Sequence, residues 1–299
     1  FDKIMIENHA TLFMTMQKYR NAERYADKVY YHLHNEVTND FGCKHEIAQV
    51  KKVLGVSNYI VETLDRFLRE HGEGGLKPEQ KAVWRNGVDT SRFGSEEADK
   101  KAQVFRKKYG IGENDVVFLF SGRLTPEKGA EELLRAFSEV AEEISNAKLV
   151  VAGAFFFNSN IVSPFEQKLR DLASNPGVKD RIIFTGFVDY DDMPAIYAMS
   201  DVCVLSSIWD DPAPLAVIES LVSGKPLITT RSGGIPEYAD NQSAIILERN
   251  DRLVDQLAEA MIELAQDAGK RAAMGAHAVT LRSGLNKEMY MSQLSGLMR

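Results

Sequence analysis

Residues 116–129 read VVFLFSGRLTPEKG, and residues 130–144 continue as AEELLRAFSEVAEEI. The first five residues are apolar and favour a buried strand, whereas the apolar residues after Gly129 recur at the three- and four-residue spacing of one helix face. Between the two segments, a pair of glycines encloses an arginine and a lysine. A strand, a glycine-containing loop and a helix in this order are typical of a parallel sheet covered by helices.

The same alternation of apolar runs and helical patterns continues in both directions along the chain. Toward the N-terminus we expect apolar runs at 4–6, 29–33 and 52–56, with helical patterns at 11–19 and 58–68, the second capped by Ser57. Toward the C-terminus we expect strands at 149–152, 182–184, 202–205, 227–229 and 244–247, and helices at 164–173, 193–199, 215–222 and 253–265. The predicted fold class is α/β with doubly wound parallel sheets.

The length of 299 residues favours two domains rather than one. A turn at residues 85–89 and a polar, charged stretch at 90–108 mark the boundary. We expect an N-terminal domain at 1–95, a C-terminal domain at 96–280, and a last helix within 281–299 that packs back toward the N-terminal domain. Because the sequence starts at Phe1 without a methionine, we also expect the N-terminal domain to be incomplete.

The composition excludes several classes of protein. A formal net charge of −7 disfavours a general nucleic-acid binder, which needs a basic surface to displace phosphate counterions. Two distant cysteines, Cys43 and Cys203, give no disulfide framework and no metal-binding spacing, which fits a reducing cytoplasm. No apolar run reaches the roughly 18 residues that would indicate a membrane span.

Loops that follow strands are where a doubly wound sheet binds its ligand. Arg123 and Lys128 lie in such a loop before a helix, and a guanidinium, an ammonium and a helix N-terminus all suit a diphosphate. The alternative is an ordinary solvent-exposed connection between a strand and a capped helix, which would have the same sequence pattern. In residues 206–219, a proline at the first helical turn leaves the following amides free to bind an anion.

Glu219 falls inside an otherwise apolar helix, where a carboxylate is costly unless it meets hydrogen-bond donors. Sugar hydroxyls are such donors, and an ion pair with a neighbouring helix is the alternative. A third loop carries Gly233 and Gly234, which permit unusual backbone angles.

Together these residues resemble the family-4 retaining glycosyltransferases of the GT-B fold, of the bacterial polysaccharide or spore-coat type. The family shows a Gly-Arg-Leu-x-x-x-Lys-Gly loop, two acidic residues with seven residues between them, and a Gly-Gly-x-Pro-Glu loop. In this chain they correspond to 122–129, to Asp211 and Glu219, and to 233–237. The chain departs from the family at Asp211, where glutamate is usual, and at Pro214, where glycine is frequent; adjacent Asp210 is an alternative to Asp211.

The resemblance implies a retaining, metal-independent hexosyltransferase with two Rossmann-like domains and no cofactor. It would take a nucleotide-diphosphate sugar, with a UDP-sugar the expected donor, and a glycan or lipid-linked acceptor, with peripheral membrane contact if the acceptor is a lipid. The implied catalytic residues are His34, Asp211, Arg123 and Lys128. The implied donor-binding residues are Gly122, Arg123, Lys128, Phe187, Val188, Asp211, Ala213, Pro214, Leu215 and Glu219, and no metal ligand is implied.

The candidates for the catalytic histidine are His32 and His34. Because side chains alternate between the two faces of a strand, residues two apart lie on the same face if the strand continues to His34. We favour His34, and a hydrogen-bonded structural histidine is the alternative for either. We also expect one aromatic residue of the loop 155–160 to border the donor or acceptor pocket. Two other functions stay open: a non-catalytic sugar-nucleotide-binding protein, and a phosphorylase-like enzyme that uses sugar phosphate.

Overall fold

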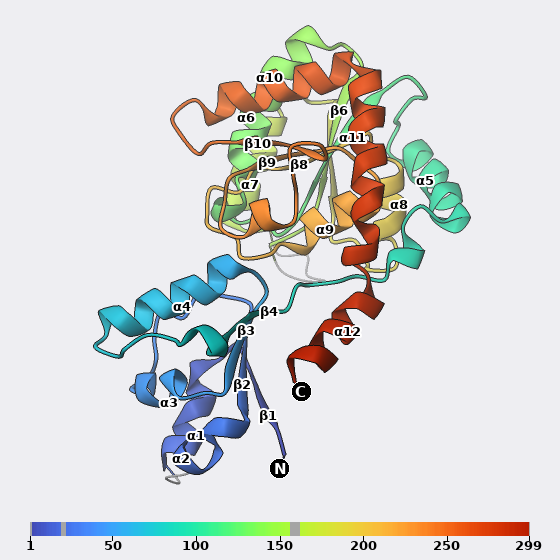
Figure 1. The fold of residues 1–299 in the computed structure, drawn as a ribbon. Helices are drawn as coiled ribbons and strands as arrows, with labels where there is room; N and C mark the ends of the chain where they lie inside the picture. Colours follow the sequence, from blue (N-terminus) through green and yellow to red (C-terminus); the bar gives the residue numbers. More distant parts are fainter. Residues whose placement is uncertain (1, 19–21, 156–161, 299) are drawn as a thin grey trace. The chain divides into compact units, whose positions relative to one another are not determined.

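A computed structural model describes residues 2–18, 22–155 and 162–298, which form two compact units (Figure 1). One unit runs to Asn86 and includes the segment from Glu288 onward, and the other spans Gly87–Lys287. The division expected from the sequence lies further along the chain, at 95/96, and those domain limits stay a prediction. The last helix of the chain lies mostly in the first unit.

The first unit is built on a parallel sheet. Its four described strands are β1 (Ile4–Glu7), β2 (Val29–Leu33), β3 (Lys52–Gly55) and β4 (Lys81–Val83), and they lie side by side in that order. The helices are α1 (Phe13–Lys18), α2 (Ala22–Tyr25), α3 (Lys44–Ala48), α4 (Asn58–Glu70) and α12 (Lys287–Leu297), with 3-10 turns η1 (Ala10–Leu12), η2 (Ala26–Lys28) and η3 (Pro78–Gln80). The parallel sheet confirms the α/β prediction for this half.

Two local interactions fix helices of this unit. The Ser57 hydroxyl accepts a hydrogen bond from the Ile60 amide, so Ser57 is the N-cap of α4 that the sequence predicted. At the other end of the chain, the Trp84 indole stacks on the Tyr290 ring at 4.3 Å and donates to the Tyr290 carbonyl at 2.9 Å. These contacts anchor α12 to the end of β4.

The second unit contains a parallel sheet of six described strands. They are β5 (Val116–Ser121), β6 (Ala147–Ala152), β7 (Ile182–Gly186), β8 (Val202–Leu205), β9 (Leu227–Thr230) and β10 (Ala244–Leu247), in the spatial order β10-β9-β8-β5-β6-β7. The chain moves outward from β5 to β7 and then returns to the other side of β5 with β8. The strand order therefore reverses between β5 and β8, which is where such sheets bind ligands.

Helices cover both faces of this second sheet. They are α5 (Glu96–Lys108), α6 (Ala130–Glu143), α7 (Pro164–Ala173), α8 (Met193–Ala198), α9 (Leu215–Val222), α10 (Leu253–Gln266) and α11 (Ala268–Thr280), with 3-10 turns η4 (Thr90–Arg92), η5 (Pro126–Lys128), η6 (Ile235–Glu237) and η7 (Leu281–Gly284). Apolar residues of α6, α7 and α10, among them Phe137, Leu169 and Leu257, form the core on one face. The strands and helices expected after residue 116 are confirmed to within about two residues.

Two helices of this unit, α5 and α11, were not anticipated. α5 lies in the charged stretch that the sequence suggested as an inter-domain boundary, and its buried residues are only Ala98 and Ala102. It therefore lacks the apolar stripe that identifies a helix in a sequence. The Ser95 cap and the acidic first turn were the available signals.

A close backbone contact joins the loops after β5 and β8. Gly129 has a φ of 69°, and a Cβ added to it would lie 1.8 Å from the Ser206 carbonyl oxygen. The Ser206 hydroxyl in turn donates to the Gly129 carbonyl at 2.7 Å. Only glycine allows the two loops to approach this closely.

Replacing Gly129 by alanine should therefore destabilise the protein by at least about 3 kcal/mol, because it adds a steric clash to an unfavourable φ. Gly110→Ala is the matched control, since Gly110 has a φ of 65° and no atom within 4 Å of an added Cβ. The control should lose only about 1 kcal/mol. Urea unfolding followed by circular dichroism measures both, and equal losses would contradict the role given to the Ser206 contact.

Candidate functional site

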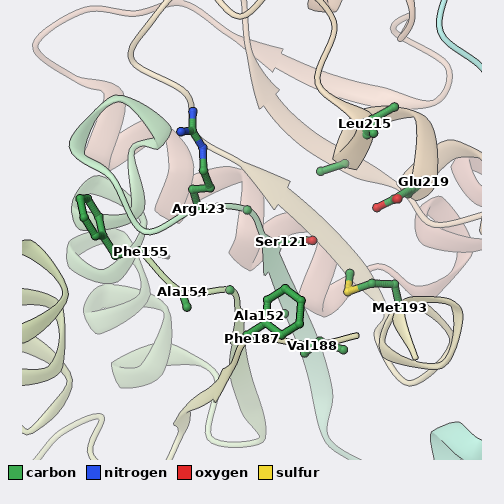
Figure 2. Close-up of a pocket in the computed structure, with 13 residues that line it drawn as sticks. Ser121, Arg123, Ala152, Ala154, Phe155, Phe187, Val188, Met193, Leu215 and Glu219 are labelled. Atoms are coloured by element: carbon green, nitrogen blue, oxygen red, sulfur yellow. The ribbon is translucent and has the colours of Figure 1, made fainter. Parts of the chain in front are cut away.

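A cavity of about 240 Å³ opens at the carboxyl ends of the central strands of the second unit (Figure 2). A second hollow of about 310 Å³ adjoins it and shares part of its wall. The shared residues are Ser121, Gly122, Arg123, Leu215 and Ala216. Both hollows lie where the strand order reverses, so the site is at the position that the sheet topology favours for a ligand.

Arg123 lies in the wall of both hollows, in the loop that follows β5. Its side chain is exposed, and among the described residues it has no hydrogen-bond or ion-pair partner. Gly122 precedes it and donates its amide to the Ala152 carbonyl at 3.1 Å. The charge of Arg123 acts on the nearby Glu127 carboxyl, but no described side chain is hydrogen-bonded to the guanidinium, so its donors remain available at the cavity wall.

Lys128 lines the second hollow, and its ammonium contacts the carboxylate of Asp211. Asp211 is only 7% exposed, whereas Lys128 is half-buried. The Gly234 amide donates to the Asp211 carbonyl at 2.9 Å, and a Cβ on Gly233 would lie 2.4 Å from that oxygen. The glycine pair of the loop after β9 thus packs on the backbone of Asp211 and fixes its position.

Asp210, the alternative to Asp211, has other partners. Its Oδ1 accepts from the Gly233 amide at 3.1 Å and from the Arg249 guanidinium at 2.5 Å. Arg249 also donates to the Ile208 carbonyl at 3.2 Å. Asp210 therefore holds the loop in shape, and Asp211 is the one that meets a cation on the cavity wall.

Glu219 projects from α9 into the first cavity (Figure 2) and is 7% exposed. Burial raises the pKa of its carboxyl to about 7, while a hydrogen bond from Tyr197 and the charge of Arg92 act in the opposite direction. The Tyr197 hydroxyl on α8 donates to Glu219 Oε2 at 3.0 Å. Among the described residues Glu219 forms no ion pair. The ion pair with a neighbouring helix, which was the alternative from the sequence, is therefore not formed, and the neighbouring helix α8 contributes a tyrosine instead.

The helix α9 begins at the cavity wall. Pro214 is its N-cap residue, and the amides of Leu215 and Ala216 follow in the first turn, where an α-helix leaves its N–H groups without intrahelical partners. Leu215 is 50% exposed, whereas Ala213 is buried. The positive end of the helix dipole is thus directed at the same space as Arg123 and Lys128.

The opposite wall of the first cavity is apolar. Phe187 and Val188, the residues expected near the nucleotide base, both line it, and so does Met193 at the start of α8. Phe155 lines the cavity too, which confirms that an aromatic residue of its loop borders a pocket; residues 156–160 of that loop lie outside the described part of the chain.

Sequence reasoning missed several residues of the site. Ser121 ends β5, and Ala152, Gly153 and Ala154 follow the same edge at β6. Their position after a strand was the available signal. The sequence gives no signal for Tyr197, because an aromatic residue on an amphipathic helix is usually part of the hydrophobic core.

His34 lies in the first unit, just after β2, with 41% of its side chain exposed. Its ring lies 4.3 Å from that of His32, so the two histidines share a face as predicted. His32 is buried, and burial lowers the pKa of its imidazole to about 4. Its Nδ1 lies 2.9 Å from Oε2 of Glu7, a partner that the sequence did not suggest.

No helix of the described residues is long and apolar enough to cross a membrane.

A sequence model of the family described as "Glycosyl transferases group 1" matches residues 101–280. The chain is 34% identical over 229 residues to the putative glycosyltransferase YtcC of Bacillus subtilis, covering 72% of this chain and 53% of that protein. It is 35% identical over 197 residues to a protein of Mycobacterium tuberculosis named GDP-mannose-dependent alpha-(1-6)-phosphatidylinositol monomannoside mannosyltransferase, covering 64% and 48%. The chain spans about half the length of these curated relatives.

Among solved structures, Anabaena Alr3699/HepE in complex with UDP and glucose superposes with a TM-score of 0.75, covering 99% of this chain and 77% of that one at 18% identity. At this identity the match concerns the fold. It agrees with the two parallel sheets and with the predicted pair of Rossmann-like domains. The chain therefore belongs to the group 1 glycosyl transferases and has the GT-B fold.

Proposed function

We propose that this chain carries the donor site of a retaining glycosyltransferase that moves a hexose from a nucleotide-diphosphate sugar to a glycan or lipid-linked acceptor. One observation supports this most strongly. Arg123, Lys128, the first amides of α9 and the carboxyl of Glu219 all meet at cavities beside the strand-order reversal. Cations and helix-end amides suit a diphosphate, and a carboxyl close to them suits hydroxyl groups.

The proposed chemistry is stabilisation of the leaving diphosphate. Cleavage of the bond from the anomeric carbon to the diphosphate oxygen increases negative charge on that oxygen. Fixed donors that already face this position stabilise the transition state more than the ground state. In this proposal Arg123, Lys128 and the N-terminus of α9 supply those donors, and neither a metal nor a cofactor is required.

Asp211 would have two successive partners. It pairs with Lys128 in the structure, and a diphosphate would compete for the same ammonium. A carboxylate that shares its cation with phosphate oxygens can accept hydrogen bonds from sugar hydroxyls instead. Aspartate is one methylene shorter than the glutamate usual in the family, so we propose a closer approach of the sugar at this position.

The nucleoside would lie against the apolar wall. Phe187 and Val188 are proposed to contact the base, and Glu219 the ribose hydroxyls. UDP is the first candidate donor nucleotide, since a neighbour of the same fold was crystallised with UDP. GDP is the second, because the relative at 35% identity is named as GDP-mannose-dependent.

The remaining roles belong to the first unit and to the whole protein. We propose His34 as the residue that faces the anomeric carbon, by its resemblance to the family histidine and its exposed ring. A cytoplasmic protein is proposed, with peripheral contact at the inner face of the membrane if the acceptor is a lipid.

The proposal is tested by incubating the protein with UDP-, GDP- and ADP-sugars and inorganic phosphate, with and without EDTA. We expect nucleotide release from one class of donor at the same rate in EDTA, and a product that NMR shows to retain the donor's anomeric configuration. Sugar phosphate formed from phosphate would favour the phosphorylase-like alternative. Nucleotide binding without transfer to any acceptor tried would favour the non-catalytic one.

Replacing Arg123 by alanine should lower kcat by about 100-fold, the scale of removing one preorganised donor. Because Arg123 is exposed and has no described partner, its loss should leave the unfolding free energy nearly unchanged. Arg135→Ala is the matched control, since Arg135 is an exposed arginine of the same unit paired only with Glu131 on α6. Steady-state kinetics compare the two, and wild-type turnover in Arg123→Ala would contradict the phosphate role.

Glu219 makes stability depend on pH. With its pKa raised to about 7, folded Glu219 keeps a proton that the unfolded chain releases above about pH 4.5, so its contribution to stability falls as the pH rises from 4.5 to 7. Glu219→Gln cannot ionise, so relative to this variant the wild type should lose up to roughly 3 kcal/mol between pH 5 and 8.

Urea unfolding of both proteins at four pH values in this window measures the difference. Parallel pH profiles would show that Glu219 is not the titrating group. At pH 8, where the Glu219 carboxyl is ionised, the same variant should raise the donor KM by about tenfold or more, since a neutral amide replaces a carboxylate as acceptor.

A further inference from the structure

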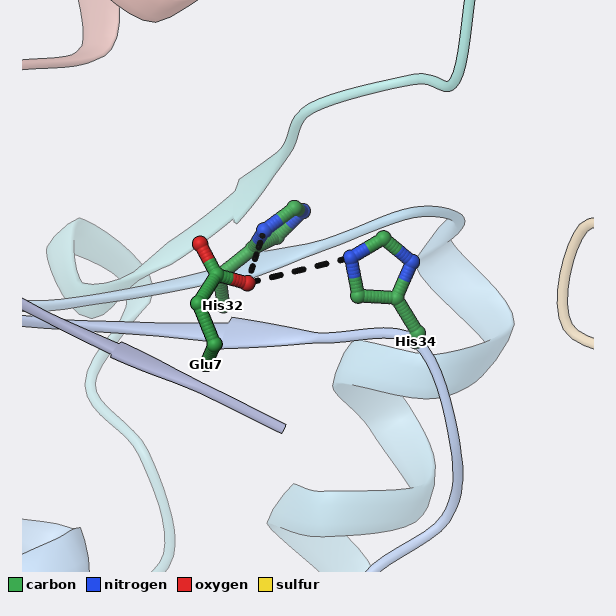
Figure 3. Close-up of side chains that lie close together, drawn as sticks. All are labelled: Glu7, His32 and His34. Carbon is green, nitrogen blue, oxygen red and sulfur yellow. Dashed lines mark hydrogen bonds and ion pairs between the residues drawn. The ribbon is translucent and has the colours of Figure 1, made fainter. Parts of the chain in front are cut away.

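Three chemistry-bearing side chains gather at the carboxyl ends of β1 and β2, outside the donor cavity. The two strands are parallel, and Glu7 pairs in register with His32. His34 follows two residues later and presents its ring on the same side (Figure 3). The sheet therefore brings the Glu7 carboxylate next to two imidazoles that lie 25 or more positions further along the chain.

The distances within this group suit a common ligand. Glu7 Oε2 lies 2.9 Å from Nδ1 of His32 and 3.9 Å from Nε2 of His34. One donor atom from each of the three residues lies within 4.8 Å of the others. Figure 3 shows one Glu7 carboxylate oxygen with a dashed line to each of the two rings. A tetrahedral zinc ion, with bonds of about 2.0–2.1 Å, holds its ligand atoms about 3.3 Å apart.

Side-chain rotation alone could close the remaining gap. Glu7 and His34 have 56% and 41% of their side chains exposed, so both are free of tight packing. His32 is fixed, because its ring is buried and lies 4.3 Å from the Trp84 ring. Because His32 is fixed and the other two side chains can rotate, the Glu7 and His34 ligand atoms can move to the spacing that a metal ion requires.

The backbone that carries the three ligands is already tied together by Asn8. Its amide donates to the His32 carbonyl at 2.8 Å, and its side-chain oxygen accepts from the amides of His34 and Asn35 at 3.1 and 3.0 Å. Asn8 adopts a φ of 55°, a conformation that asparagine tolerates better than most residues. The backbone at His32 and His34 is thus held next to Asn8 before any ligand arrives, while the side chains of Glu7 and His34 can still rotate.

We propose that Glu7, His32 and His34 bind one divalent transition-metal ion, through one carboxylate oxygen, Nδ1 of His32 and Nε2 of His34. Two imidazoles and one carboxylate are ligands of zinc and similar ions rather than of magnesium or calcium, which prefer oxygen alone. Three protein ligands leave a fourth position for water. The ion replaces the hydrogen bond between His32 and Glu7, and both groups remain its ligands.

A simpler role for the group is a hydrogen bond from His32 to Glu7 that holds the buried ring, with His34 nearby by chance. That role needs neither His34 nor a metal. Nε2 of His32 is buried without a partner among the described residues, so metal binding at Nδ1 removes no interaction from it. The two roles are distinguished by a metal titration, because only the metal site predicts that one ion binds per chain.

The metal site goes beyond the proposed transfer reaction and does not depend on it. A bound ion would occupy the imidazole of His34, which we propose to face the anomeric carbon. Zinc should therefore inhibit transfer, while EDTA leaves it unchanged. Metal binding in the absence of donor is nevertheless the primary measurement, so failure of one proposal does not decide the other.

The test uses the full chain after dialysis against EDTA, titrated with Co²⁺ by visible absorption and with Zn²⁺ by calorimetry. We expect one ion per chain and cobalt bands of the intensity that tetrahedral coordination gives. Glu7→Gln and His34→Ala should each weaken binding by about 100-fold or more, the upper end of the loss seen even for residues that only support a ligand. Both residues are exposed, so neither substitution should impair folding, and circular dichroism verifies this.

His45→Ala is the matched control, because His45 is also an exposed histidine near a single carboxylate, Glu73, at 3.6 Å. It should bind metal as the wild type does. Absence of one-to-one binding in the wild type would overturn the metal site. So would equal affinity in the wild type, Glu7→Gln and His34→Ala.

Discussion

The candidate site depends on backbone segments that approach more closely than any side chain would allow. At each contact a glycine Cα faces a carbonyl oxygen of another loop. Three of the contacts of this kind lie at the candidate site: Gly129 on Ser206, Gly153 on Gly122, and Gly233 on Asp211. They join the loops after β5, β6, β8 and β9 at one edge of the sheet. Because the loops are held by their backbones, their side chains and the amides of α9 remain available to a ligand.

Burial of Glu219 in the candidate site carries an electrostatic cost. Glu219 is buried with a pKa raised to about 7, and Tyr197 supplies only one hydrogen bond to it. A carboxyl that is satisfied only in part gains more from a ligand hydroxyl than one that is fully bonded inside the protein. Sites selected for ligand binding are commonly less stable than an apolar replacement would make them.

The sequence predicted those features that repeat along the chain or have a local signal. Buried strands such as β8 are continuous apolar runs, and Ser57 shows the pattern of an N-cap. It did not predict α5, whose few buried residues are alanines, nor the contact between Glu7 and His32. The latter depends on the register of two strands, which is set by packing of the whole sheet. The pairing of Lys128 with Asp211 likewise depends on how two loops meet.

The difference between the two cations of the site follows from their chemistry. An ammonium loses strong hydration when it is half-buried, and a nearby carboxylate offsets that loss, which accounts for Asp211 beside Lys128. A guanidinium is more weakly hydrated and stays charged without an ion-pair partner, so Arg123 can lie at the cavity wall with no ion pair to any described residue. A diphosphate at the proposed site would therefore compete with a carboxylate in direct contact only at Lys128, since the described residues form no ion pair with Arg123. In the proposed function, binding of the diphosphate to Lys128 would release the Asp211 carboxylate where the sugar would lie, and recognition of the phosphates would be coupled to recognition of the sugar.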